Sequence, residues 1–220
     1  MSSDTMALRV AELMKAYDKQ PYTTEFDGFQ LKIGKGVFPT DVSFATLKLG
    51  HILGNYHPEY AIDMGCGCGY LALVMRRNGV PKVYAADRHP PAIECVLENI
   101  RNNPEVGPIE VCQSDLFQEI EKEVVFDLMV FNHFYRPGGT GIFGENDDGG
   151  KDVFQRFLSE AKHRLNAGGV ILTSFVKMSD PENDPQAIAI QEGFNLRTLL
   201  TEENYMNMGD LFIYEISLGA

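Results

Sequence analysis

Cationic residues and cysteines are scarce in this sequence, and long apolar runs are absent. Lysine and arginine number 19 against 31 aspartate and glutamate residues, which gives a formal net charge of −12. No apolar stretch approaches the roughly 20 residues that a membrane helix needs. The N-terminus lacks the basic and then apolar layout of a signal peptide. We therefore expect a cytoplasmic protein with no membrane partner.

The shortage of cations also bears on partners. Nucleic-acid binding relies on lysine and arginine side chains that neutralise phosphates, and no cluster of them is visible in the sequence. The acidic stretch Gly144–Asp152 would repel a phosphate backbone. We therefore expect nucleic acid to be an unlikely partner and favour a small molecule or a protein.

The four cysteines give no sign of a disulfide framework or a metal site. Cys66 and Cys68 are too close for a relaxed disulfide within one tight loop. They also lack the paired C-x-x-C spacing of a zinc site, and the histidines form no recognisable metal set. We expect small buried thiols between glycines and no metal.

The length of 220 residues suits one α/β domain. A helix is expected over residues 6–18, followed by a hairpin whose strands, 22–26 and 29–33, flank Asp27-Gly28. A helix over 42–53 is expected to begin with Thr40 or Asp41 as its N-cap. From residue 60 strands and helices alternate, which predicts a doubly wound, mostly parallel sheet of seven strands. One of these helices is expected over residues 152–165, closed by Ala167-Gly168-Gly169. The last two strands, 194–201 and 210–217, have no helix between them, which favours antiparallel pairing at one edge.

A glycine loop between a predicted strand and a predicted helix is the main functional signal. It reads DMGCGCG from Asp63 to Gly69. Glycines let the backbone approach a ligand closely, and the loop N–H groups and helix N-terminus favour a carboxylate. Tyr70 stands where a dinucleotide fingerprint needs its third glycine. An acidic residue before the glycines suits an ammonium group better than a pyrophosphate, so the loop predicts S-adenosylmethionine over a nicotinamide or flavin.

Two further aspartates follow predicted strands. Asp87 ends the next strand, where an acidic residue can accept both ribose hydroxyls. Asp115 follows the third strand and can accept the adenine amine, with Leu116 or Phe117 covering the ring. The alternatives are a solvated helix cap for Asp87 and an ordinary turn residue for Asp115.

The fourth predicted strand, 126–131, ends in Asn132-His133-Phe134-Tyr135, four residues able to hydrogen-bond or stack. Tyr135 can stack on a planar acceptor or place its ring face near a sulfonium. His133 can serve as general base if the acceptor must lose a proton. The alternative for His133 is a packed or solvent-facing side chain.

The order of these motifs resembles that of the class I methyltransferases of the HemK-like protein-glutamine type and of the related ribosomal-RNA guanine type, within the small-domain N-methyltransferase group. Those families have Asn-Pro-Pro-Tyr or a close variant at the end of the fourth strand. Here Asn132 and Tyr135 keep the outer positions, and His133 and Phe134 replace the prolines. Residues 36–39 resemble the segment that closes over the cofactor, and residues 148–158 and 165–170 resemble the glycine-rich return and helix of HemK-like proteins.

The resemblance implies a Rossmann-like methyltransferase fold with S-adenosylmethionine as cofactor. In the family the asparagine side chain and a following carbonyl accept hydrogen bonds from a planar nitrogen, and Asn132 is expected to do so here. The expected catalytic residues are Asn132, His133 and Tyr135. The expected cofactor-binding residues are Phe38, Asp63, Gly65, Gly67, Gly69, Asp87, Arg88, Asp115, Leu116 and Asn132.

The predicted function is N-methylation of a planar amide or amine in a small molecule or protein. Two alternatives stay open: a small-molecule O-methyltransferase of a biosynthetic pathway, and a cofactor-binding partner subunit that has lost catalysis. We divide the chain into residues 1–40, a helix and hairpin that cover the cofactor or substrate, and residues 41–220, the methyltransferase domain.

Overall fold

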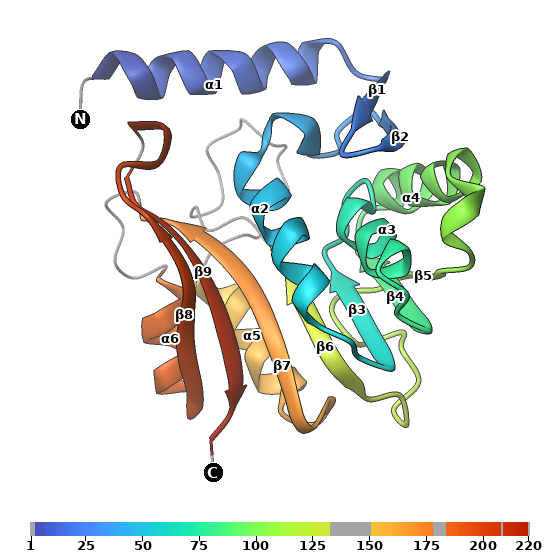
Figure 1. The fold of residues 1–220 in the computed structure, drawn as a ribbon, viewed down its shortest axis with the longest axis vertical. Coiled ribbons are helices and arrows are strands. Elements are labelled where there is room, and N and C mark those ends of the chain that lie inside the picture. Colours follow the sequence, from blue (N-terminus) through green and yellow to red (C-terminus); the bar gives the residue numbers. More distant parts are fainter. Residues whose placement is uncertain (1–2, 133–150, 178–183, 208, 220) are drawn as a thin grey trace.

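A seven-stranded sheet runs through the middle of the protein (Figure 1). The computed structural model describes residues 3–132, 151–177, 184–207 and 209–219. The strand order is β5-β4-β3-β6-β7-β9-β8. The first five strands in this order run parallel, namely β5, β4, β3, β6 and β7. Strand β9 runs antiparallel to both β7 and β8. The strands are β3 (Tyr60–Met64), β4 (Lys82–Asp87), β5 (Glu110–Gln113), β6 (Phe126–Phe131), β7 (Leu165–Val176), β8 (Phe194–Glu202) and β9 (Leu211–Leu218). The predicted fold class and the antiparallel edge are confirmed.

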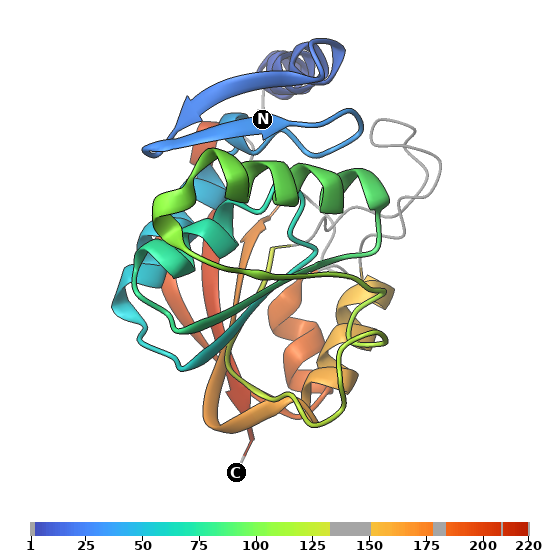
Figure 2. The ribbon, with the colours of Figure 1, turned by 90° about the vertical axis from the view of Figure 1, so that its right-hand side faces the viewer.

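Helices cover both faces of the sheet (Figures 1 and 2). Successive strand residues point to opposite faces, so Ala61 and Leu128 join one apolar core while Ile62 and Met129 join the other. The first core lies under three helices, and the second under the other two. These helices are α2 (Phe44–Ile52), α3 (Tyr70–Arg77) and α4 (Pro90–Asn102) on one face, and α5 (Lys151–Ala161) and α6 (Pro185–Gln191) on the other.

The N-terminal residues form helix α1 (Ser3–Asp18) and the predicted hairpin of β1 (Tyr22–Phe26) and β2 (Phe29–Ile33). Asp27 and Gly28 both have positive φ, at 49° and 80°, as the tight turn between the two strands requires. Figure 2 shows the hairpin lying above α4. The Asp27 carboxylate accepts hydrogen bonds from Tyr70 and Arg77 of α3. These two donors hold the pKa of Asp27 below its usual value despite partial burial, so the hairpin turn is fixed to the main domain.

Two predicted element ends were wrong. Thr40 and Asp41 lie in a short 3-10 turn, and the N-cap of α2 is Ser43, whose hydroxyl accepts the Thr46 N–H at 3.3 Å. Helix α5 was expected to continue to Leu165 and stop at glycines, but it ends at Ala161. Strand β7 already begins at Leu165, because the backbone carbonyl of Arg164 accepts the Phe126 N–H at 2.8 Å and brings the chain onto β6. In the described part of the chain, no helix is long and apolar enough to cross a membrane.

Candidate active site

The carboxyl ends of β3, β4, β5 and β6 meet at one edge of the sheet. Strand β3 lies between β4 and β6, so the chain order reverses there. Open α/β sheets bind ligands outside the carboxyl ends of their strands at such a reversal. The glycine loop and Asn132 follow strands that end at this edge, and Asp87 is the last residue of β4. The topology therefore brings together motifs that are far apart in the sequence.

The glycine loop has a backbone that favours glycine at three positions. Gly65, Gly67 and Gly69 have φ of 66°, 55° and 83°, in the left-handed region. A Cβ on Gly69 would lie 3.0 Å from a methyl group of Val96 on α4, which is too close for normal packing. The Gly69 N–H donates to the Cys66 carbonyl at 2.8 Å and closes the turn. Conformation explains the glycine at all three positions, and limited space adds to it at Gly69.

Asp63 is buried beneath the loop, with 2 % of its surface exposed. One carboxylate oxygen accepts the Ala72 N–H of α3 at 3.1 Å. Burial raises the pKa of Asp63 to about 8, the charge of Asp87 acts in the same direction, and the Ala72 hydrogen bond opposes the rise. A cationic ligand group beside Asp63 would restore the ionised form. The site therefore fits the ammonium group of S-adenosylmethionine.

Asp87 joins the end of β4 to the glycine loop. It is 8 % exposed, and its two oxygens accept the Gly67 N–H at 3.0 Å and the His89 N–H at 2.9 Å. His89 is the N-cap of α4, so Asp87 orders the start of that helix as well as the loop. A carboxylate has about four lone-pair sites, so these two bonds leave capacity for ribose hydroxyls. Its role toward a ribose stays a prediction.

Asp115 and Arg88 lie farther along the same edge. An Asp115 oxygen pairs with the Arg156 guanidinium of α5 at 2.8 Å, and both side chains are partly exposed. Leu116 beside it is buried and has a φ of 53°. The Arg88 side chain donates to the His89 ring at 3.1 Å. The adenine role of Asp115 stays a prediction, and the ion pair with Arg156 leaves lone pairs of the carboxylate for such a contact.

Asn132 follows β6 and is held by side chains from two other elements. Its Nδ2 donates to the Thr46 hydroxyl of α2 at 3.0 Å, and its Oδ1 accepts from the Ser174 hydroxyl of β7 at 2.5 Å. Thr46 is itself 2.8 Å from the hydroxyl of Ser43. The carboxamide plane is thus fixed from both ends. His133 and Tyr135, the other two expected catalytic residues, lie outside the described residues.

The segment around Phe38 is attached to the glycine loop. Phe38 is half-buried, and two residues later the Thr40 hydroxyl accepts a hydrogen bond from the Cys68 thiol at 3.3 Å. Burial raises the pKa of Cys68 to about 12, which keeps the thiol protonated as a donor. Cys66, Cys68 and Cys95 are buried free thiols, as expected, and Cys112 is partly exposed. A covering role for residues 1–40 stays a prediction.

Three residues that hold the site were missed in the sequence: Thr46, Ser174 and Asn99. Nothing in the local sequence distinguishes Thr46 or Ser174, because each meets Asn132 only after folding. Asn99 had a signal, since it shares the buried face of α4 with Ala92, Cys95 and Val96. A polar residue at that spacing needs a buried hydrogen-bond partner. In the described ranges, no group of three His, Cys, Asp or Glu residues is placed to hold a metal ion.

Comparison with known proteins assigns the chain to a family. The sequence model of the family described as methyltransferase small domain matches residues 29–204. This chain belongs to that family. It is therefore an S-adenosylmethionine-dependent methyltransferase, which confirms the expected enzyme class and cofactor and the family resemblance.

The chain is similar to ribosomal protein L11 methyltransferases. One from Thermotoga neapolitana is 33 % identical over 194 residues, which is 87 % of this chain and 66 % of that protein. Another from Bacillus cytotoxicus is 26 % identical over 80 % of this chain and 49 % of its own length. The chain thus spans about half to two thirds of these relatives.

Solved structures share the fold. The Thermus thermophilus 16S rRNA N2 G1207 methyltransferase RsmC, in complex with AdoMet and guanosine, has a TM-score of 0.68 at 22 % identity, covering 90 % of this chain and 50 % of that chain. A complex of aTrm5 and tRNALeu has a TM-score of 0.56 at 18 % identity, and the match covers 90 % of this chain and 52 % of that chain.

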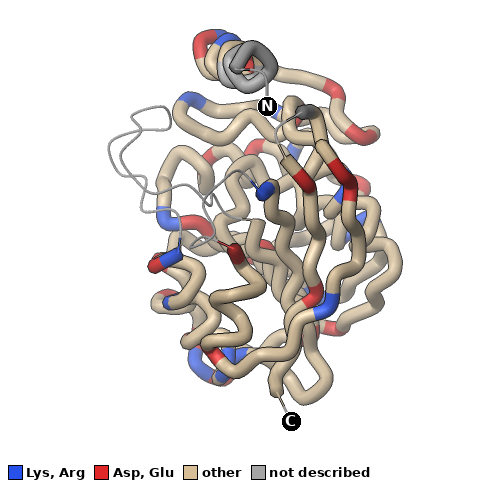
Figure 3. The backbone as a smooth tube through the Cα atoms, turned by 90° about the vertical axis from the view of Figure 1, so that its left-hand side faces the viewer, with Lys and Arg blue, Asp and Glu red and all other residues tan. Residues whose placement is uncertain are grey.

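The expectation that nucleic acid is an unlikely partner was wrong. By their names, the relatives act on a ribosomal protein and proteins of the same fold act on or bind ribosomal and transfer RNA. Net charge sums over the whole surface, whereas recognition depends on the local field within roughly one Debye length, about 8–10 Å. Figure 3 shows Lys and Arg beside Asp and Glu at several places on the fold, so the sum of −12 does not describe every surface.

Proposed function

We propose that this methyltransferase transfers the methyl group to a planar amide or amine nitrogen of a protein acceptor, presented at Asn132. The observation that supports this most is the fixed carboxamide of Asn132 at the end of β6, beside the glycine loop that follows β3. A nitrogen at this edge would lie between the cofactor loop and a rigid polar group.

The hydrogen bonds with Thr46 and Ser174 hold the Asn132 carboxamide from both ends, and we call them the clamp. They determine which atoms of Asn132 are available to an acceptor. Thr46 takes one of the two N–H donors, and Ser174 takes one lone pair of the oxygen. The oxygen keeps a second lone pair, which suits an N–H donor on the acceptor. Accepting that hydrogen bond would direct the nitrogen lone pair toward the methyl group. Methyl transfer by in-line displacement depends mainly on such alignment and on excluding water.

The protein acceptor is favoured by the relatives rather than by the geometry. Their names specify a ribosomal protein, and the 33 % identity to one of them extends over 87 % of this chain. The structures whose names include an RNA, at 22 % identity or less, support the fold alone. The intact glycine loop with the buried Asp63 and Asp87 disfavours the alternative of a cofactor-binding partner subunit that has lost catalysis.

Labelled methyl transfer into cell extract tests the acceptor class. The purified chain would be incubated with methyl-labelled S-adenosylmethionine and extract from cells that lack its gene. We expect label that resists ribonuclease, disappears with protease and is stable to mild base, as N-methyl groups are. Label that ribonuclease removes would replace the protein acceptor with RNA, and label only in small molecules would contradict both.

The variant Asn132→Ala tests the site itself. We expect turnover to fall by about a hundredfold or more with affinity for S-adenosylhomocysteine within a few-fold, because orienting groups act mainly in the transition state. Ser174→Ala is the matched control: it removes one end of the clamp and should cause a smaller loss of turnover. Wild-type turnover in Asn132→Ala would show that the acceptor binds elsewhere.

A further inference from the structure

Asn99 of α4 and Asn103, the C-cap of that helix, pair with the open edge of β2 as a neighbouring strand would. Asn103 accepts the Gln30 N–H at 2.9 Å and donates to the Gln30 carbonyl at 3.0 Å. Asn99, one helical turn earlier, accepts the Lys32 N–H at 2.7 Å and donates to the Lys32 carbonyl at 2.9 Å. Gln30 and Lys32 alternate along β2, so each carboxamide satisfies both backbone groups of one strand residue. Strand β1 already pairs with the other edge of β2.

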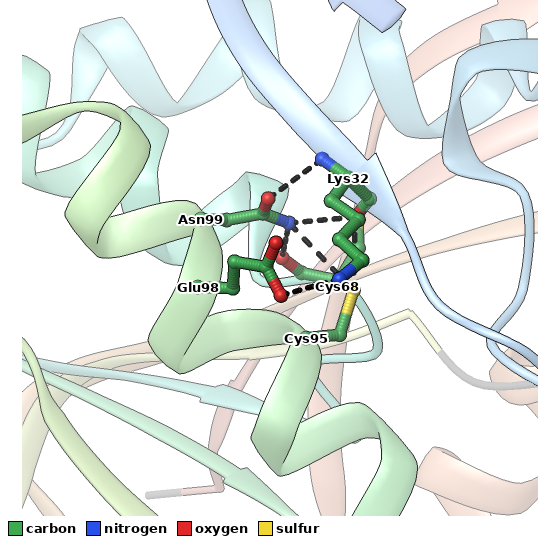
Figure 4. A network of polar contacts seen from close by, with 5 residues as sticks. All are labelled: Lys32, Cys68, Cys95, Glu98 and Asn99. Atoms are coloured by element: carbon green, nitrogen blue, oxygen red, sulfur yellow. Dashed lines mark hydrogen bonds and ion pairs between the residues drawn. The ribbon is translucent and has the colours of Figure 1, made fainter. Parts of the chain in front are cut away.

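Asn99 makes one bond that Asn103 does not. Its Nδ2 also donates to the carbonyl oxygen of Cys68 in the glycine loop, at 2.9 Å. Figure 4 shows Asn99 between Lys32 of the hairpin and Cys68 of the loop. The side chain is completely buried, and its two N–H donors are divided between the hairpin and the loop. Asn99 is therefore a direct link between β2 and the cofactor loop.

The bond to Cys68 fixes the peptide that leads into α3. The carbonyl of this Cys68–Gly69 peptide is held by Asn99, and its N–H donates to the Cys66 carbonyl at 2.8 Å. Gly69 then turns into α3 with a φ of 83°. Both polar groups of one peptide plane are thus fixed, and with them the path of the glycine loop into α3.

We propose that Asn99 is a positioning residue for the cofactor, which couples the β1–β2 hairpin to the glycine loop so that cofactor binding and hairpin docking stabilise each other. It does not touch the reacting atoms; it acts through Cys68 and Lys32. The partly exposed ion pair of Lys32 with Glu98, at 2.6 Å, lies beside this link and contributes little by comparison. The proposal rests on S-adenosylmethionine binding at the glycine loop.

A pair of matched variants tests this link. Asn99→Ala and Asn103→Ala each remove a buried carboxamide and one pairing with β2, but only the first frees the Cys68 carbonyl. At a temperature where both are folded, calorimetry should show S-adenosylhomocysteine affinity at least tenfold weaker in Asn99→Ala and within threefold of wild type in Asn103→Ala. The KM for S-adenosylmethionine should rise in the same proportion, with a smaller change in kcat. Equal weakening in both variants, or none in Asn99→Ala, overturns the proposal.

Hydrogen exchange of the wild-type chain tests the coupling without any substitution. Adding S-adenosylhomocysteine should slow amide exchange at Lys32, which Asn99 holds, more than at Gln30, which Asn103 holds. Protection of residues 65–70 with no change at Lys32 overturns the coupling but leaves the cofactor site intact. Failure of wild type to bind S-adenosylhomocysteine would instead contradict the cofactor site.

Discussion

Asp63 and Asp87 are buried carboxylates on either side of the glycine loop. Asp63 is hydrogen-bonded from α3 and Asp87 from the loop itself. Neither forms an ion pair among the described residues, so each depends on backbone N–H donors. Substitution of either residue should therefore have effects that a surface aspartate would not show, and pH should act on Asp63.

Asp87→Ala should weaken cofactor binding. The change leaves the Gly67 and His89 N–H groups without their acceptor and removes the expected ribose contact. We expect the binding free energy of S-adenosylhomocysteine to weaken by about 1–3 kcal/mol, measured by calorimetry. Asp115→Ala is the control, with a smaller loss because Asp115 is partly exposed and paired with Arg156. Unchanged affinity in Asp87→Ala would remove Asp87 from the cofactor site.

Asp63 should make the stability of the ligand-free protein depend on pH. Its pKa is raised from 3.8 to about 8 by burial, so the folded state holds the proton more tightly than the unfolded state. The stabilisation of the folded state by this proton is complete below about pH 4 and is lost as pH rises toward 8. Between pH 5 and 8 the free energy of unfolding of wild type should fall relative to Asp63→Asn by a few kcal/mol, measured by urea denaturation.

Asp27→Asn provides the opposite control for this pH series. The pKa of Asp27 is lowered by Tyr70 and Arg77, so its contribution is present above its unfolded pKa and is lost only in acid. The difference between wild type and Asp27→Asn should be flat from pH 5 to 8. If the wild type and Asp63→Asn curves also run parallel there, Asp63 is ionised in the folded protein.

At the scale of elements, the packing of α4 and the conformation of the glycine loop constrain each other. Gly69 lies against Val96, and the next turn of α4 places Asn99 on the Cys68 carbonyl. The loop therefore takes its shape from both left-handed backbone and the helix packed beside it. A substitution that needs either more space or another φ should affect loop and helix together.

Comparison of Gly69→Ala with Gly36→Ala separates the requirement for space from the requirement for positive φ. Both glycines have positive φ, 83° and 75°, but only Gly69 lacks room for a Cβ. We expect Gly36→Ala to reduce the free energy of unfolding by about 1–2 kcal/mol through backbone strain. Gly69→Ala should lose about 1–3 kcal/mol more through contact with Val96. Equal losses in urea denaturation would show that α4 moves away without cost.

At the scale of the whole molecule, the net charge of −12 should influence how an acceptor arrives. Opposite charge on a protein partner accelerates association, and salt screens that attraction. With a basic protein acceptor, we expect kcat/KM to fall as ionic strength rises from about 0.02 to 0.3 M while kcat changes little. A neutral peptide from the same methylation site is the control. If both substrates respond equally to salt, the charge of the molecule plays no part in acceptor recruitment.

The sequence alone determined the order of strands and helices, the hairpin turn and the glycine loop. These features depend on short-range rules: periodicity of apolar residues, positive φ at Asp27-Gly28 and at the glycines, and residues placed directly after strands. Such rules also predicted that Asp63 lies in one strand, that Asp87 ends the next strand and that Asn132 follows the fourth. Their common edge followed from parallel pairing, because the carboxyl ends of parallel strands meet.

Only the tertiary structure decided which side chains hold those residues. Asn132 meets Thr46 across 86 residues and Ser174 across 42, Asn99 meets Lys32 across 67 and Cys68 across 31, and Asp115 meets Arg156 across 41. Each pair forms because packing brings separate elements together, and the hydrogen-bonding capacity of a threonine or asparagine is the same with any neighbour. The local sequence can therefore indicate that a buried polar group needs a partner, but only the folded chain selects the partner.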